Sequence, residues 1–254
     1  MSPAVPVLAP LAARYVDWLR LPAAATSNTD DEDPQLVRAM PLVMRIERAD
    51  PPSRTPLLEA AAAAALAVCL DPRAEPGGEW HEAVATWVNG RIRKIARRAR
   101  GAHWTAVESL PGVTATVDGA SVRALLPGLV SRTPREVSRL QISGTEVPAD
   151  SPGDPPPGRA VVWLNPSVEL TVGKAAAQVG HATMILAAAL PSADLAAWRD
   201  ARWRTCVRVA SAGRWVEVSR AADSGERGLV LVRDAGFTEV DPGTVTCAAQ
   251  WRVT

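Results

Sequence analysis

Lysine is rare in this chain: 28 residues are lysine or arginine, and Lys94 and Lys174 are the two lysines among them. An ammonium is a compact point charge that a partly buried site can hold, whereas the arginine fork suits surface recognition of phosphate. Because arginine is preferred so strongly elsewhere, Lys174 is a candidate for chemistry. The alternative is that it is an ordinary solvated helix residue.

Lys174 shares one face of a predicted helix with two other polar residues. The segment 171–190 is rich in alanine, begins with a threonine that can cap it and is followed by proline, which predicts a helix. At about 100° per residue, Gln178 lies about 40° from Lys174 and His181 within about 20°. Three polar groups therefore converge, although such a stripe is also typical of a solvated helix face.

A second candidate segment, residues 234–246, lies between two predicted strands and begins with Asp234. Ligands of α/β sheets collect beyond the carboxyl ends of strands, so a carboxylate there is well placed for chemistry. The Asp-Ala-Gly sequence is also ordinary turn chemistry. A phosphate-binding P-loop is excluded, because the pattern needs glycine where Val168 stands and serine or threonine where Ala175 stands.

Together the two motifs resemble the type 2 peptidyl-tRNA hydrolase family. Its hallmark helix has the sequence Gly-Lys-x-Ala-Ala-Gln-x-x-His-Ala, and a later loop has Asp-Ala-Gly-x-Thr followed by Pro-Gly-x-x-Thr. This sequence matches both motifs, and the resemblance covers residues 159–254. It implies a four-stranded mixed sheet flanked by helices, and hydrolysis of the ester that joins a peptide to tRNA, which recycles tRNA in translation.

The resemblance also implies the site residues. The catalytic set carried over by motif is Lys174, Gln178, His181, Asp234 and Thr238, with Thr246 as a substrate-binding residue. One departure concerns the start of the helix. Family members often have Gly-Lys-Gly-Lys where this chain has Thr-Val-Gly-Lys at 171–174, so an extra cation that could help to grip tRNA is missing.

Ester hydrolysis needs a positioned water, a group that takes its proton, and positive charge where the oxyanion develops. We expect Lys174 to stabilise the oxyanion or the leaving ribose oxygen, and Asp234 to orient or deprotonate the water, or only to fix the lysine. Thr238 and Gln178 are expected to hold water or substrate. His181 is either a base or a structural histidine bonded to backbone. We expect no covalent intermediate, metal or cofactor, because no nucleophile elbow or metal spacing is present.

Composition places the chain among soluble globular proteins, with 47% hydrophobic residues and a formal net charge of +1. A tRNA partner must therefore be met by a local patch. Cys69, Cys206 and Cys247 are too scattered for a disulfide framework, and the apolar run 60–70 is far shorter than a membrane span. We expect a cytoplasmic protein without a membrane partner.

One segment offers such a local patch, because residues 91–100 hold six cations. We expect a helix over 79–99 whose apolar side faces the core and whose basic side follows phosphates. The alternative is a solvated helix face neutralised by nearby acids. The substrate-binding residues predicted on this stripe are Arg93, Lys94, Arg97 and Arg100.

A proline-rich connector at 149–158 divides the chain, because consecutive prolines stiffen an exposed segment and remove backbone donors. We expect an N-terminal helix and acidic linker (1–33), an α/β domain (34–148), the connector, and a hydrolase-like domain (159–254). C-terminal strands are predicted at 160–164, 204–210, 229–233 and 245–252, with helices at 171–190, 193–202 and 215–222. N-terminal strands are predicted at 42–47, 104–110, 113–117 and 140–143, with helices at 7–20, 57–70, 79–99 and 121–126.

The fold class is therefore α/β: a small mixed sheet flanked by helices, preceded by a second α/β domain. The two domains begin with elements in the same order, and the tetrad 144–147 is similar to 236–240 without its phenylalanine. One interpretation is a diverged duplicate that has lost the lysine and aspartate, making a pseudo-dimer within one chain. An unrelated domain, or a homodimer, is the alternative. For function, the alternative is an inactive module that binds tRNA or protein and keeps the hydrolase fold.

Overall fold

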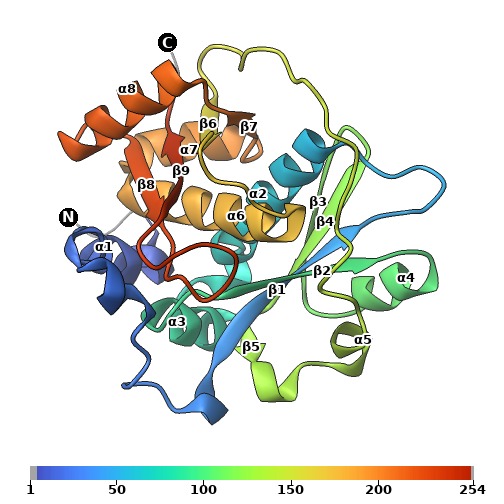
Figure 1. The fold of residues 1–254 in the computed structure, drawn as a ribbon. Helices are drawn as coiled ribbons and strands as arrows, with labels where there is room; N and C mark the ends of the chain where they lie inside the picture. The colour runs from blue at the N-terminus through green and yellow to red at the C-terminus, as the bar shows by residue number, and fades with distance from the viewer. Residues whose placement is uncertain (1–4, 253–254) are drawn as a thin grey trace.

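Two mixed sheets form the protein, and a computed structural model describes residues 5–252. In the first sheet the order is β2-β1-β4-β3, with β5 paired to the start of β1, and in the second it is β7-β6-β9-β8. Figure 1 shows the two sheets on opposite sides of a pair of central helices. The strands are β1 (Arg38–Arg45), β2 (Lys94–Ala99), β3 (Gly112–Val117), β4 (Ala120–Leu125), β5 (Gly128–Leu129), β6 (Ala160–Leu164), β7 (Thr205–Val209), β8 (Leu229–Arg233) and β9 (Val245–Gln250).

The two sheets have the same topology. In each, the first two strands along the chain are parallel, the fourth is antiparallel to the first, and the third is antiparallel to the fourth. Two helices join the parallel strands in both halves, and one helix precedes the third strand. These helices are α2 (Arg54–Leu70), α3 (His81–Asn89) and α4 (Ala102–Glu108) in the first half, and α6 (Val172–Ala189), α7 (Ser192–Asp200) and α8 (Ala212–Asp223) in the second. The predicted α/β class is confirmed for both halves.

The central helices α2 and α6 pack directly against each other. Both consist almost entirely of apolar residues, as expected for helices that are buried on all sides. The Thr183 hydroxyl donates to the Ala62 carbonyl at 3.1 Å, and a Cβ added to Gly180 would lie 3.0 Å from that of Ala65. Small residues thus allow the two helix backbones to approach closely, and one hydrophobic core spans both halves.

The C-terminal elements agree with the sequence predictions. Strands β6 and β8 have the predicted bounds, and the three helices and remaining two strands differ from prediction by a few residues at most. The strong signals here are the threonine before α6, the proline after it, and short apolar runs bounded by turn residues.

Several N-terminal predictions are wrong. The helix expected at 79–99 ends at Asn89, and the basic segment continues as strand β2. The strand expected at 104–110 is helix α4, the helix expected at 121–126 is strand β4, and 140–143 contains only an isolated bridge at Gln141. Asp118 and Gly119 both have positive φ, 44° and 84°, the geometry of a type I′ hairpin turn. That Asp-Gly signal could have placed the hairpin.

The N-terminal segment packs against both halves. Helix α1 (Ala9–Arg20) lies along the edge strand β8, where the Tyr15 hydroxyl donates to the Leu231 carbonyl and accepts from its N–H. Arg14 donates to the carbonyls of Asn89 and Gly90. The remaining short elements are η1 (Pro6–Leu8), η2 (Ala23–Ser27), η3 (Pro34–Leu36), η4 (Pro72–Ala74), η5 (Val130–Arg132) and α5 (Arg135–Ser138). Over residues 5–252, none of the helices combines the length and apolar character needed to cross a bilayer.

Candidate active site

The N-terminus of α6 is held by side chains from three separate segments. The Thr171 hydroxyl caps the helix by accepting from Lys174 N–H at 3.2 Å, as predicted. The Glu239 carboxylate accepts from both the N–H and the hydroxyl of Thr171, at 3.0 and 2.8 Å. Thr145, from the first half, accepts from Gly173 N–H at 3.2 Å. Donors that a helix start leaves without partners are therefore satisfied, and the first turn is fixed.

The loop after β8 folds back on itself and aims Asp234 at α6. The ladder between β8 and β9 shifts register between Val232 and Arg233, and such a bulge redirects the next side chain. Gly236 has φ +81°, and a Cβ there would lie 2.4 Å from Pro242, so only glycine fits. Its N–H donates to Asp234 Oδ1 at 2.8 Å. The carboxylate is thus oriented by its own loop.

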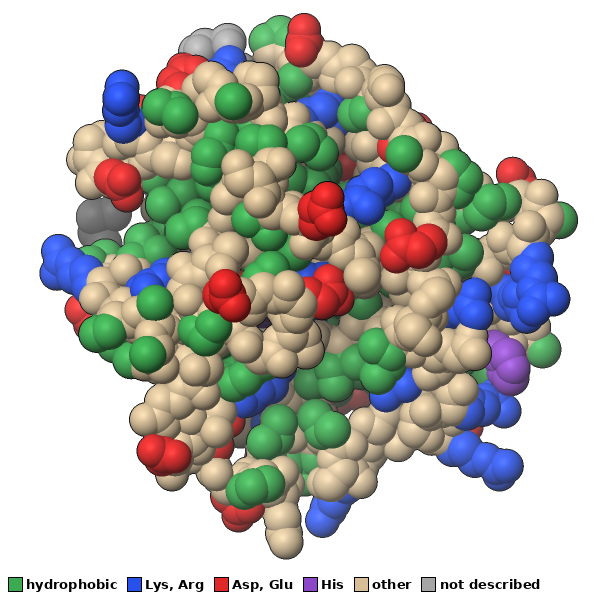
Figure 2. Space-filling view, in the orientation of Figure 1, with side chains coloured by type: hydrophobic (Ala, Val, Ile, Leu, Met, Phe, Trp, Pro, Cys, Tyr) green, Lys and Arg blue, Asp and Glu red, His purple; other side chains and the backbone are tan. Residues whose placement is uncertain are grey.

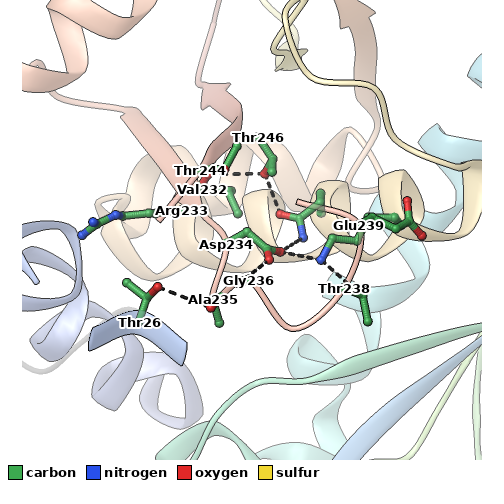
Figure 3. A network of polar contacts seen from close by, with 12 residues as sticks. Thr26, Val232, Arg233, Asp234, Ala235, Gly236, Thr238, Glu239, Thr244 and Thr246 are labelled. Atoms are coloured by element: carbon green, nitrogen blue, oxygen red, sulfur yellow. Dashed lines mark hydrogen bonds and ion pairs between the residues drawn. The ribbon is translucent and has the colours of Figure 1, made fainter. Parts of the chain in front are cut away.

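Lys174 and Asp234 form a nearly buried ion pair. Lys174 Nζ lies 2.8 Å from Asp234 Oδ2, and the two side chains are only 10% and 8% exposed. They come from segments 60 residues apart in the chain (234 minus 174), one on α6 and the other beyond the end of β8. Figure 3 shows Asp234 pointing from its loop toward α6. The structure therefore brings together the two residues that the sequence singled out for chemistry.

A chain of hydrogen bonds runs through this pair from the core to the surface. Buried Thr246 donates to Gln178 Oε1 at 2.6 Å, and Gln178 Nε2 donates to Asp234 Oδ2 at 2.6 Å. On the outer side, Lys174 Nζ donates to Thr238 Oγ1 at 3.2 Å. Figure 3 shows Thr238 at the end of this network. Because Thr238 is exposed, the network reaches the surface there.

The sequence predicts that Gln178 holds water or substrate and that Thr246 binds substrate, but both side chains are buried. Thr246 is 0% exposed and Gln178 only 2% exposed, and both ends of the Gln178 amide already have partners within the protein. Because neither side chain reaches the surface, Thr246 orients Gln178, and Gln178 orients Asp234. A motif alone does not indicate which of its polar residues face inward.

His181 lies away from the ion pair. It follows Lys174 by two helical turns, a rise of about 10 Å, and its Nδ1 lies 3.0 Å from Lys94 Nζ of β2. The expected backbone partner is therefore replaced by the second lysine of the chain. Burial, together with the positive charges of Lys94 and the more distant Lys174, lowers the pKa of His181 well below its usual value. Burial also lowers the pKa of Lys94 to about 7.

The predicted basic helical stripe is wrong, because these residues lie on or beside strand β2 and most contact the protein itself. Arg93 forms a two-pronged pair with Glu32, Lys94 contacts His181, and Arg97 donates to the backbone carbonyl of Leu140. Arg100 follows the end of the strand. The acidic linker thus neutralises part of the basic segment. In Figure 2, lysine and arginine gather at the α4–α5 side of the visible face, and acidic side chains lie near its centre.

Arg233 is a site residue that the sequence interpretation missed. Its guanidinium donates to the carbonyl of Gly243, in the loop between β8 and β9, and to the carbonyls of Trp18 and Leu19 at the end of α1. Cationic groups are favourable at a helix C-terminus. The Thr26 hydroxyl also lies 3.4 Å from the Ala235 carbonyl. The N-terminal segment therefore supports the loop from outside, a relation between residues more than 200 positions apart that no local pattern indicates.

The site and fold together define an α/β protein with a lysine–carboxylate centre at the start of a buried helix. The family model for peptidyl-tRNA hydrolase PTH2 matches residues 159–250. Among curated proteins, the chain is 36% identical over 94 residues to a peptidyl-tRNA hydrolase of Methanopyrus kandleri, covering 35% of this chain and 79% of that protein. It is 35% identical over 100 residues to that of Metallosphaera sedula (35% and 82% covered) and 34% identical over 95 residues to that of Thermoplasma acidophilum (35% and 80% covered). The chain belongs to the PTH2 family through this C-terminal segment.

No group of three or more histidine, cysteine, aspartate or glutamate residues among positions 5–252 is arranged to hold a metal ion.

Proposed function

We propose that this protein hydrolyses the ester between a peptide, or an N-blocked amino acid, and tRNA. The observation that carries the proposal is the nearly buried Lys174–Asp234 pair, which the chain assembles from two distant segments. A buried ion pair is a poor source of stability, because desolvation of the two charges offsets most of their attraction. Such a pair beside the exposed hydroxyl of Thr238 therefore favours a chemical role over a structural one.

Lys174 is placed to stabilise developing negative charge. An ammonium has three N–H donors, of which two are used by Asp234 and Thr238. The third is available to the oxyanion of the tetrahedral intermediate or to the leaving ribose oxygen. Because the ammonium is already fixed by two acceptors, it needs little reorganisation as charge develops, which is the main source of electrostatic catalysis.

Asp234 is placed to orient the attacking water. Its Oδ2 accepts from both Lys174 and Gln178, whereas Oδ1 accepts from Gly236 N–H. Each carboxylate oxygen can accept about two hydrogen bonds, so Oδ1 keeps capacity for a water. The Thr238 hydroxyl accepts from Lys174 and has its own proton free to donate. Carboxylate and hydroxyl can then hold a water beside the ammonium, with Asp234 taking its proton during attack.

The proposed substrate is taken from the names of the relatives. Proteins that match the C-terminal segment are named peptidyl-tRNA hydrolase, and the proposal transfers that activity to this chain. Peptidyl-tRNA is then the partner, and we place the reaction in the cytoplasm. The free thiols of Cys69, Cys206 and Cys247 fit a reducing compartment.

The test is release of the acyl group from N-acetyl-aminoacyl-tRNA by the full chain. Wild type should release it, and Lys174→Met and Asp234→Asn should each lower kcat by about 100-fold or more, as expected when a main electrostatic or acid–base group is removed. Asp241→Asn changes an exposed carboxylate of the same loop and serves as the matched control. Circular dichroism checks that each variant is folded. Absence of release by wild type with retained tRNA affinity would instead favour a binding module.

A further inference from the structure

Phe237 is an exposed residue of the loop that carries Asp234 and Thr238. It is the one phenylalanine of the chain and lies between Gly236, which orients Asp234, and Thr238, which contacts Lys174. It is 45% exposed, and the other large hydrophobic side chains exposed within residues 5–252 are valine, leucine and isoleucine. An aromatic surface is thus presented to solvent one residue from the hydroxyl at which the polar network ends.

Arg93 supports this ring from the first half of the molecule. Its guanidinium carbon lies 5.0 Å from the centre of the Phe237 ring, within the range of cation–π contact. Both outer nitrogens of the same guanidinium donate to the Glu32 carboxylate. Because Arg93 is fixed and largely neutralised by Glu32, it is poorly placed to bind a phosphate. It backs the ring, and the exposed surface of Phe237 remains for a ligand.

We propose that Phe237, backed by Arg93, forms a stacking subsite for the nucleobase at the 3′ end of the substrate RNA. The proposal rests on the proposed function, because it needs the ester beside Lys174. The base attached to the esterified ribose is the aromatic ring of the RNA that lies nearest to the bond that is cut. With that bond held near Lys174 and Thr238, the base lies within reach of Phe237. Stacking on aromatic side chains is a general way in which proteins hold unpaired bases.

The peptide is a weaker candidate for this surface. Specific recognition of an apolar side chain needs a concave site that removes most of it from water. Phe237 lies on an exposed loop and offers one open ring surface. A flat base needs only such a surface, and the contact is tolerant of base identity because every base has a π-face.

The experiment measures binding of the full protein to a short RNA hairpin that ends in single-stranded CCA with a free 3′ hydroxyl. A second hairpin, identical except for an abasic 3′-terminal nucleotide, is the comparison. We expect wild type to bind the complete hairpin about 5- to 150-fold more tightly, the range for one base stacked on an aromatic side chain. Phe237→Ala and Phe237→Leu should lose this discrimination, and Phe237→Trp should retain it. Val216→Ala, which truncates an exposed residue of α8, should leave it unchanged.

Equal discrimination by Phe237→Ala and wild type would overturn the proposal. So would retention by Phe237→Leu, because an apolar contact rather than stacking would then suffice. Because the hairpins carry no ester, the result is independent of turnover. If wild type discriminates between them but releases no acyl group from N-acetyl-aminoacyl-tRNA, the terminal base is bound without hydrolysis, as the binding-module alternative requires, and only the hydrolase proposal fails.

Discussion

The two halves of the molecule differ most in the connection between their last two strands. Strands β3 and β4 are joined by the tight turn Asp118-Gly119, whereas β8 and β9 are joined by a loop over residues 234–244. That loop supplies Asp234, Thr238 and Glu239 to the site. The same order of strands and helices therefore exists with and without the carboxylate, and the site depends on the loop rather than on the sheet.

The central helices show a matching difference. Aligning the caps Ser53 and Thr171 places Pro56 at the position of Lys174 and Ala60 at that of Gln178. The first half thus lacks the ammonium and the amide as well as the loop. The comparison indicates that only the second half has the residues proposed for chemistry on its central helix.

We propose that the two halves are diverged copies. In the same alignment Ala62 corresponds to Gly180, and Ala65 corresponds to Thr183. Across the contact between α2 and α6, Ala62 lies against Thr183 and Ala65 lies against Gly180. Such reciprocal contacts are typical of a two-fold interface. The similar tetrads 144–147 and 236–240 do not contribute, because the first follows the fourth strand and the second precedes it.

The first half contributes a wall to the site of the second. Ala96 and Thr145 would contact a Cβ placed on Gly173, Lys94 lies beside His181, and Arg93 backs Phe237. The first half thus packs against the helix and loop that carry the candidate site residues.

The largest effect on stability is expected where the two turns are compared directly. Gly236→Ala places a methyl group 2.4 Å from Pro242 at φ +81°, whereas Gly119→Ala at φ +84° meets nothing within 4 Å. The first should cost about 3 kcal/mol or more because strain and overlap combine, and the second about 1–2 kcal/mol from strain alone. Urea unfolding measures both. Equal costs would show that the loop is not constrained as described.

A further effect is expected in the pH dependence of stability, at a lysine that the first half places beside the central helix of the second. Because burial lowers the pKa of Lys94 from 10.5 to about 7, the unfolded chain binds a proton between these values that the folded protein does not. The free energy of unfolding should therefore increase as pH rises from about 7 to about 10.5. Lys94→Met should remove this slope. The lowered pKa of His181 acts at lower pH, with stability falling as pH drops below about 6.5. Denaturant melts from pH 5 to 10 measure both, and a Lys94→Met variant with the wild-type slope above pH 7 would contradict the assignment.

The smallest effect is expected at the edge of the second sheet. Burial raises the pKa of Tyr15 to about 12, so its hydroxyl keeps the proton that it donates to the Leu231 carbonyl. Tyr15→Phe removes this bond and the one accepted from Leu231 N–H, and should cost about 1–2 kcal/mol of unfolding free energy. The matched change Tyr15→Leu should cost more, because it also removes ring packing. If Tyr15→Phe is neutral, α1 does not secure the edge of β8.

The second half could be predicted from sequence because its signals are local. The cap, the alanine-rich helix and the apolar strands each determine their own element, and the family motif places Lys174 and Asp234 in one site. The inward orientation of Gln178 and Thr246 depends on how β9 packs behind α6, which no local pattern contains. In the first half, the apolar residues of 84–95 have spacings that fit a helix. Strand β2 forms because it pairs with β1, which is distant in sequence. The pairing of Arg93 with Glu32 likewise depends on tertiary folding.

A double-mutant cycle on kcat/KM for acyl release from N-acetyl-aminoacyl-tRNA tests the central claim most directly. Lys174→Met, Asp234→Asn and the double variant are compared with wild type. Substitutions of groups that act as one unit have strongly non-additive effects. The kcat/KM of the double variant should therefore be at most about threefold lower than that of the less active single variant. Losses that multiply, or a single variant with wild-type activity, would contradict a site built on this pair.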